Sequence, residues 1–119
     1  MKILVVEDHE DTLRVMSRLL TMEGHDIDTA TTLSGGRLRL DSHVYDLLIA
    51  DIGLPDGPGY ALMSAATQRR IPGIAISGYG MSDDITASRA AGFTIHLTKP
   101  VNLQTLLQAV NTARKTSAT

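Results

Sequence analysis

The chain has 119 residues, of which 43% are hydrophobic and 20% are charged, and its net charge is −2. These values fit one globular domain with a sizeable core, and without a basic surplus we do not expect direct binding to nucleic acid. No apolar stretch reaches the length of a membrane span, no signal-peptide pattern opens the chain, and the absence of cysteine excludes disulfides, thiol catalysis and zinc–thiolate sites.

Short apolar runs alternate with helical patterns five times along the chain. We expect strands at about residues 2–6, 25–29, 47–50, 74–76 and 95–97. Helices are expected at about 9–23 and 32–40, then from Pro58, from Ser82 to Gly92, and from Asn102 onward. This alternation predicts an α/β domain with a parallel sheet and helices on both faces.

The second strand and the second helix are the weakest of these elements. The strand has Ile27 among polar residues, a pattern that an edge strand tolerates. Thr31 or Thr32 is placed to cap the helix, but Gly35 and Gly36 each cost about 1 kcal/mol relative to alanine in a helix interior.

Charged and hydroxyl side chains stand where the apolar strands end. Glu7 and Asp8 follow the first strand, Asp51 closes the third, Ser77 closes the fourth and Lys99 follows the fifth. In an open parallel sheet, ligands bind outside the carboxyl ends of the strands. One edge of the sheet would therefore carry the groups that hold a divalent cation and a phosphoryl group.

Each of these residues has an ordinary interpretation when it is taken alone. Asp8 and Lys99 are typical of solvated strand ends, while Asp51 and Ser77 are typical of turns. Convergence of several strands on one edge favours a site instead. A bare cluster of carboxylates repels itself and raises one of its own pKa values unless a cation neutralises it.

The motifs, taken together, resemble the receiver domain of two-component response regulators over essentially the whole chain. They are Val5-Val6-Glu7-Asp8, the Asp-Leu-Leu-Ile-Ala-Asp run that ends at Asp51, Leu54-Pro55-Asp56-Gly57, Ser77-Gly78 and Leu97-Thr98-Lys99-Pro100. The resemblance implies a single doubly wound (βα)5 flavodoxin-like domain over residues 1–119, with strand order 2-1-3-4-5. The sequences of residues 76–80 and 96–101 are especially similar to those of receivers attached to hybrid sensor histidine kinases.

The resemblance also implies a chemistry. Asp51 would accept a phosphoryl group from a histidine kinase or a histidine phosphotransfer protein. Asp8, Asp51 and the backbone carbonyl of Gly53 would hold Mg²⁺ or Mn²⁺ directly, and Glu7 would act through water. Such a receiver catalyses its own phosphorylation and dephosphorylation but is not itself a kinase.

Lys99 and Ser77 would contact the phosphoryl oxygens, and the Lys99-Pro100 bond would be cis. Movement of Ser77 is expected to switch the surface of the fourth helix, the last strand and the last helix. The family usually has Tyr or Phe where this chain has His96, so the usual rotation of an aromatic ring is in doubt. A surface histidine on a sheet edge is the alternative interpretation of His96.

Other functions stay open at this point. A haloacid-dehalogenase-type hydrolase would carry a second Asp two residues after the nucleophile, where this chain has Gly53. An inactive receiver kept for protein contacts is a third possibility. We expect a cytoplasmic protein, compatible with a weak homodimer. It is either the receiver of a hybrid kinase, whose parent protein could be membrane-attached, or a free-standing regulator.

Overall fold

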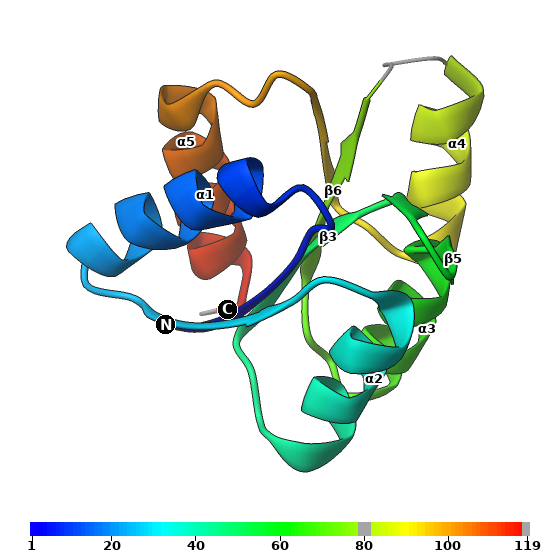
Figure 1. The fold of residues 1–119 in the computed structure, drawn as a ribbon. Helices are drawn as coiled ribbons and strands as arrows, with labels where there is room; N and C mark the ends of the chain where they lie inside the picture. The colour runs from blue at the N-terminus through cyan, green and yellow to red at the C-terminus, as the bar shows by residue number, and fades with distance from the viewer. Residues whose placement is uncertain (79–81, 118–119) are drawn as a thin grey trace.

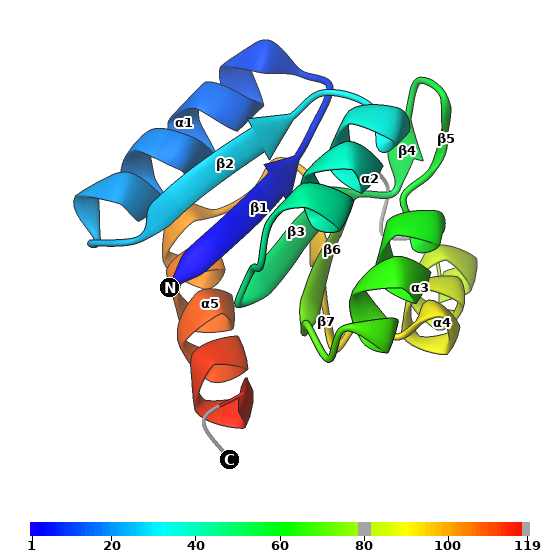
Figure 2. The ribbon, with the colours of Figure 1, turned by 90° about the horizontal axis from the view of Figure 1, so that it is seen from below.

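Five parallel strands form one sheet in the order β2-β1-β3-β6-β7 (Figure 2). The computed structural model describes residues 1–78 and 82–117. The strands are β1 (Lys2–Val6), β2 (Asp26–Ala30), β3 (Leu47–Asp51), β6 (Gly73–Ser77) and β7 (Ile95–Thr98). Counted within this sheet alone, the order is 2-1-3-4-5, so the predicted fold class is confirmed.

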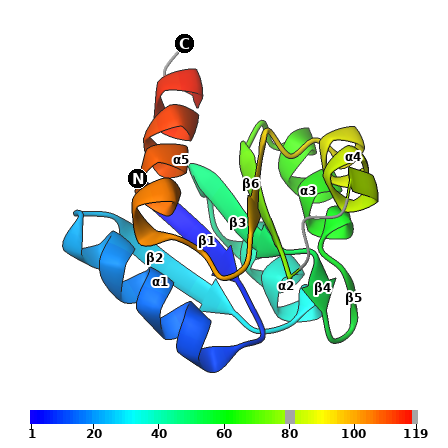
Figure 3. The same ribbon diagram turned by 90° about the horizontal axis from the view of Figure 1, so that it is seen from above.

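Helices cover both faces of the sheet, as Figures 1 and 3 show. On one face lie α1 (Glu10–Met22) and α5 (Leu103–Ser117), and on the other lie α2 (Leu33–Ser42), α3 (Tyr60–Gln68) and α4 (Ser82–Ala91). Every residue of β3 and β6 is buried, because both strands are covered on their two faces. Alternate side chains of each strand enter two separate apolar layers.

Helix α2 forms despite its two glycines, for a reason that lies in the packing. A Cβ atom on Gly36 would stand 3.0 Å from Cγ2 of Val6 and 3.1 Å from Cδ1 of Leu62. Glycine therefore lets α2 approach the sheet and α3 closely. Of the two expected caps, Thr32 is the one used: its hydroxyl accepts a hydrogen bond of 3.0 Å from the backbone N–H of Gly35.

One expected helix start is wrong. Pro58 does not open α3 but lies in β5 (Gly57–Pro58), which pairs antiparallel with β4 (Gly53–Leu54). The loop between these strands is held by Asp56, whose carboxylate accepts backbone hydrogen bonds from Leu33 at 2.6 Å and Ser34 at 3.0 Å. The chain therefore turns back once more before α3 begins at Tyr60.

Two helix ends carry the residues that such ends favour. Gly24 has φ +91° just after α1, in the left-handed region, and the side chain of Asn102 accepts a 3.1 Å hydrogen bond from the backbone of Thr105 at the start of α5. The sequence also favours a loop at Tyr79 and Gly80, after the fourth strand, and these two residues lie outside the described ones. Among the residues described, no helix is long and apolar enough to cross a membrane.

Candidate phosphoacceptor site

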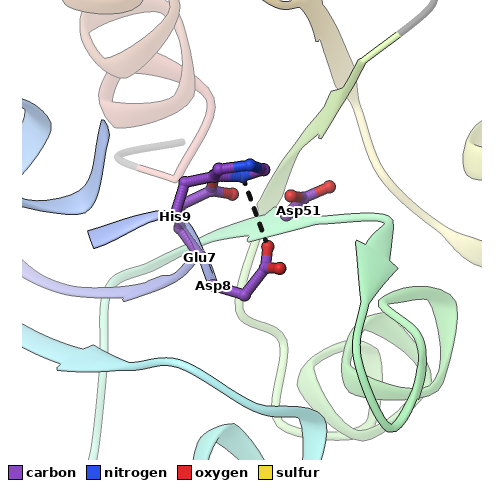
Figure 4. Close-up of side chains that lie close together, drawn as sticks. All are labelled: Glu7, Asp8, His9 and Asp51. Atoms are coloured by element: carbon purple, nitrogen blue, oxygen red, sulfur yellow. Dashed lines mark hydrogen bonds and ion pairs between the residues drawn. The ribbon is translucent and has the colours of Figure 1, made fainter. Parts of the chain in front are cut away.

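The carboxyl edge of the sheet brings the predicted side chains together. Figure 4 shows Glu7, Asp8 and His9, which follow β1, beside Asp51 at the end of β3. One potential ligand atom from each of these four residues lies within 4.8 Å of the other three. Parallel strands whose carboxyl ends meet at one edge produce this arrangement directly.

The ammonium group of Lys99 lies between two buried carboxylates. Its Nζ donates hydrogen bonds to Oε1 of Glu7 at 2.5 Å and to Oδ2 of Asp51 at 2.8 Å. The side chains of Glu7 and Asp51 are 0% and 5% exposed, and that of Lys99 is 18% exposed. Two carboxylates thus share one cation in surroundings that hold little water, where Coulomb interactions are strong.

The two carboxylates differ in their affinity for a proton. Burial, reinforced by hydrogen bonding to Asp51, raises the pKa of Glu7 to about 7. Burial also pushes the pKa of Asp51 upward, but hydrogen bonds from Glu7, from Lys99 and from the backbone N–H of Gly53 outweigh it, so the pKa of Asp51 lies below its usual value. When one proton is shared, it resides on Glu7, and Asp51 stays ionised.

Lys99 keeps its charge in this site. Burial lowers its pKa, but the hydrogen bonds and charges of Asp51 and Glu7 act more strongly in the other direction, so the net shift is upward. The ammonium group is therefore a fixed positive charge beside Asp51.

The site has oxygen atoms suited to a hard divalent cation. Oε2 of Glu7 and Oδ1 of Asp8 are buried and make no hydrogen bond to any of the described residues. Buried oxygens without a donor are costly, and Mg²⁺ prefers such carboxylate oxygens together with water. Gly53 lies beside them, since its N–H donates to Oδ1 of Asp51 at 2.9 Å. The residues present therefore fit the implied metal.

His9 belongs to this cluster; its position just after the acidic pair is compatible with the mouth of the site, although the sequence favours a solvated residue in the first turn of a helix. Its Nδ1 lies 3.3 Å from Oε1 of Glu7 and 3.7 Å from Oδ1 of Asp8, and its side chain is 70% exposed. Adjacency to the acidic pair is the one signal in the sequence that could have indicated it.

Ser77 lies at the same edge, with its hydroxyl engaged on the side away from the carboxylates. Its Oγ is 2.8 Å from Nε2 of His96, and Nδ1 of the same ring is 3.0 Å from Oγ of Ser88 in α4. His96 is therefore not a solvated surface histidine. Ser88 gave no signal in the sequence, because a single serine inside a helix is unremarkable. The Lys99-Pro100 bond is cis, as the resemblance implied.

A cavity of about 930 Å³ opens over the site. Asp51, Ser77 and Lys99 line its polar side, and apolar residues from α1 and from the segment after β7 line the rest. The apolar lining residues include Val15, Met16, Val101 and Leu103. The carboxylate of Asp51 is thus buried at the bottom of an accessible opening.

A five-stranded doubly wound sheet with a cluster of acidic groups and a lysine at its carboxyl edge defines a class of signalling domain. Residues 3–111 match the family model described as the response regulator receiver domain. The chain belongs to this family. Receiver domains of this kind interact with histidine kinases or phosphotransfer proteins.

Curated relatives place this domain in proteins of different lengths. The chain is 30% identical over 114 residues to the "Uncharacterized 14.6 kDa protein in sodA1 3'region" of Leptolyngbya boryana, covering 92% of this chain and 87% of the relative. It is 31% identical over 118 residues to the hybrid signal transduction histidine kinase G of Dictyostelium discoideum, covering 93% of this chain and 3% of the kinase. It is 32% identical over 107 residues to the transcriptional regulatory protein TcrA of Mycobacterium tuberculosis, covering 88% of this chain and 42% of that protein.

Solved structures agree with the fold. A CheY-like response regulator receiver domain protein from Methanospirillum hungatei JF-1 superposes with a TM-score of 0.92 at 28% identity, covering 98% of this chain and 95% of that one. NtrX from Brucella abortus gives a TM-score of 0.90 at 26% identity, covering 98% of this chain and 28% of that one. The same unit therefore occurs both nearly alone and as a small part of a longer chain.

Proposed function

We propose that this chain, over its whole length of residues 1–119, is the phosphoacceptor module of a two-component phosphorelay. The observation that carries the proposal is the position of Lys99, whose ammonium group joins Asp51 to Glu7 at the bottom of the cavity. A buried, ionised carboxylate beside a fixed cation is prepared to attack an anionic phosphoryl group.

The reaction that fits these groups is transfer from a phosphohistidine. A carboxylate oxygen of Asp51 forms an O–P bond while the P–N bond of the donor breaks, and the donor imidazole leaves with the electron pair and takes up a proton. Lys99 then moves its hydrogen bonds from the carboxylates to the phosphoryl oxygens, and Ser77 supplies a further hydrogen bond. Most of the catalysis lies in positioning and in charge stabilisation.

The implied cofactor is Mg²⁺ or Mn²⁺. Asp8, Asp51 and the backbone carbonyl of Gly53 would hold it directly, and Glu7 would hold it through water. Bound there, the ion supplies the positive charge that lets an anionic donor approach an anionic acceptor.

The wider context follows from the two kinds of relative. The sequence around Ser77 and Lys99 favours the receiver of a hybrid sensor histidine kinase, and the similarity to the Dictyostelium kinase supports this context. A free-standing regulator is the second candidate, favoured by the Leptolyngbya relative, which the match covers almost entirely. The genomic reading frame on either side of the chain distinguishes the two. A cytoplasmic location and a weak homodimer stay predictions.

Labelling of the acceptor tests the proposal. The chain is incubated with Mg²⁺ and radiolabelled acetyl phosphate, and the stability of the label towards hydroxylamine is measured. We expect a hydroxylamine-labile label that Asp51→Asn abolishes and that Asp28→Asn, a change in β2 away from the site, leaves intact. Retention of the same label in Asp51→Asn would overturn the assignment.

A further inference from the structure

Three side chains form a line of hydrogen bonds that leads from the site into helix α4. Oγ of Ser77 lies 2.8 Å from Nε2 of His96, and Nδ1 of His96 lies 3.0 Å from Oγ of Ser88. Ser77 is 4% exposed and Ser88 is 0% exposed. A neutral imidazole donates through one ring nitrogen and accepts through the other, and a hydroxyl can do either, so the line is chemically consistent with either tautomer.

The register of the strands builds this line. Ile74 and Ile76 of β6 pack in the layer beneath α1 and α5, so Ser77 faces the opposite layer with α3 and α4. In β7, Leu97 packs towards α1 and α5, so the neighbouring His96 also faces α4. Ser77 and His96 therefore meet on one face of two adjacent strands, with Ser88 above them.

Ser77 stands at the border between this line and the proposed acceptor. It lines the cavity with Asp51 and Lys99, and its backbone carbonyl accepts a 2.8 Å hydrogen bond from the backbone N–H of Lys99. Its hydroxyl nevertheless bonds to His96 in this structure. The same hydroxyl cannot hold this bond unchanged and also move to a phosphoryl oxygen on Asp51.

We propose that His96 is a positioning residue that couples Ser77 to α4 through hydrogen bonds, in place of the rotation of an apolar aromatic ring. The proposal rests on the proposed function of Asp51. In the resting chain the imidazole holds the Ser77 hydroxyl towards α4. When Ser77 turns towards a phosphoryl group, the imidazole loses its hydrogen bond to Ser77 and the ring shifts together with Ser88.

The hydrogen bonds of the imidazole ring carry this coupling. Loss of a hydrogen bond at a half-buried ring nitrogen is costly, so a move of Ser77 favours a new position of the imidazole. Because the second nitrogen bonds to a fully buried serine, that shift reaches the packed side of α4. Coupling between two sites is reciprocal, so a partner that fixes α4 also biases the position of Ser77. Phenylalanine at position 96 would fill the space but transmit nothing through hydrogen bonds.

The test uses the full chain labelled with ¹⁵N, with and without Mg²⁺ and beryllofluoride, which mimics a phosphoryl group on a carboxylate. Three quantities are measured: the imidazole ¹⁵N shifts of His96, amide exchange over residues 86–91 of α4, and the rate of labelling by acetyl phosphate. The variants are Ser88→Ala, His96→Phe and His96→Gln. Thr94→Ala is the matched control, since it removes another hydrogen bond beside β7, that of Thr94 Oγ1 to the carbonyl of Gly73 at 3.2 Å.

We expect beryllofluoride to move the Nε2 shift of His96 and to change exchange in α4 of the wild type. Ser88→Ala should be labelled at the wild-type rate while its α4 response falls at least about fivefold, the lower range of typical allosteric coupling. His96→Phe should lose that response and His96→Gln should restore part of it, because an amide both donates and accepts. Thr94→Ala should behave as the wild type.

Two kinds of failure can be told apart. A full α4 response in Ser88→Ala and in His96→Phe, or His96 shifts that stay unchanged while beryllofluoride binds, would overturn the coupling and leave the acceptor assignment in place. A wild-type chain that takes neither beryllofluoride nor label would overturn the proposed function, and the coupling with it.

Discussion

The carboxylates at the two ends of the sheet differ in how fully they are hydrogen-bonded. At the amino end, just before β3, the hydroxyl of Tyr45 donates a 2.6 Å hydrogen bond to Asp28 in the middle of β2, and Asp46 accepts one of 2.8 Å from the backbone of Lys2. At the carboxyl ends, Glu7 and Asp51 share the ammonium group of one lysine, and buried oxygens are left without a hydrogen-bond partner among the described residues.

This difference separates stability from chemistry. The hydrogen bond from Tyr45 lowers the pKa of Asp28, so this charge stabilises the fold at neutral pH. Burial raises the pKa of Glu7 to about 7, so ionisation of Glu7 opposes folding in the same pH range. The buried carboxylates at the carboxyl end therefore destabilise the fold until a metal ion or a phosphoryl group binds there. The hydrogen bonds at the amino end offset this destabilisation.

The largest predicted effect is that of Lys99→Ala on phosphoryl transfer. Loss of the ammonium group should slow labelling by acetyl phosphate about 100- to 1,000-fold, the usual effect of removing one preorganised donor. The variant should stay folded, because Glu7 can take up a proton when its partner is lost. It should keep Mg²⁺ binding, because Lys99 is not one of the proposed ligands. The matched control is Lys2→Ala at the amino end, where Nζ lies 5.6 Å from the centre of the Tyr45 ring. Wild-type labelling of Lys99→Ala would remove this residue from the mechanism.

The second prediction concerns the pH dependence of stability without metal. The pKa of Glu7 is about 7 in the fold and 4.5 as a free side chain, so the folded state binds more protons between these values. The contribution of Glu7 to the free energy of unfolding is complete below about pH 4.5 and is lost as the pH rises through 7. The loss is at most about 3 kcal/mol, from 1.36 kcal/mol per pKa unit.

Urea unfolding in a chelating buffer at pH 5 and pH 8 measures this loss, and Glu7→Gln should remove most of it. The control Asp28→Asn should keep the wild-type slope in this range, because the lowered pKa of Asp28 places its effect below pH 4. An equal slope in wild type and Glu7→Gln would show that another group is responsible.

The sequence was sufficient for the fold and for the residues of the acidic edge. Apart from β2, each strand is a short, mostly apolar run that a polar residue closes or follows, so the convergence of Asp8, Asp51 and Lys99 follows from local patterns and one topological rule. The second helix was harder to predict. In the sequence, Gly36 only lowers the helix propensity of this segment. The structure shows why glycine fits there, since Val6 and Leu62 leave little room for a side chain.

The features that could not be predicted from the sequence depend on contacts between distant segments. Asp56 caps helix α2 from a loop more than twenty residues away, and the backbone N–H groups of Leu33 and Ser34 lower its pKa. Propensity near Pro58 therefore favoured an early helix where tertiary contacts stabilise a hairpin. The link from His96 to Ser88 was equally hidden, because neither residue type nor spacing signals it.

The smallest predicted effect is that of Tyr45→Phe, which tests the amino end of the sheet. Tyr45→Phe removes the hydroxyl that donates to Asp28 but keeps the ring, which is 3% exposed and packed in the core. We expect a loss of about 1–2 kcal/mol in the free energy of unfolding, since the acceptor is charged and partly exposed, with labelling of Asp51 unchanged. The loss should shrink as the pH falls through the pKa of Asp28, because a protonated carboxyl no longer favours the bond. A double-mutant cycle with Asp28→Asn isolates the pair from the packing of the ring. Slower labelling in Tyr45→Phe would show that the two ends of the sheet are coupled, against the separation argued above.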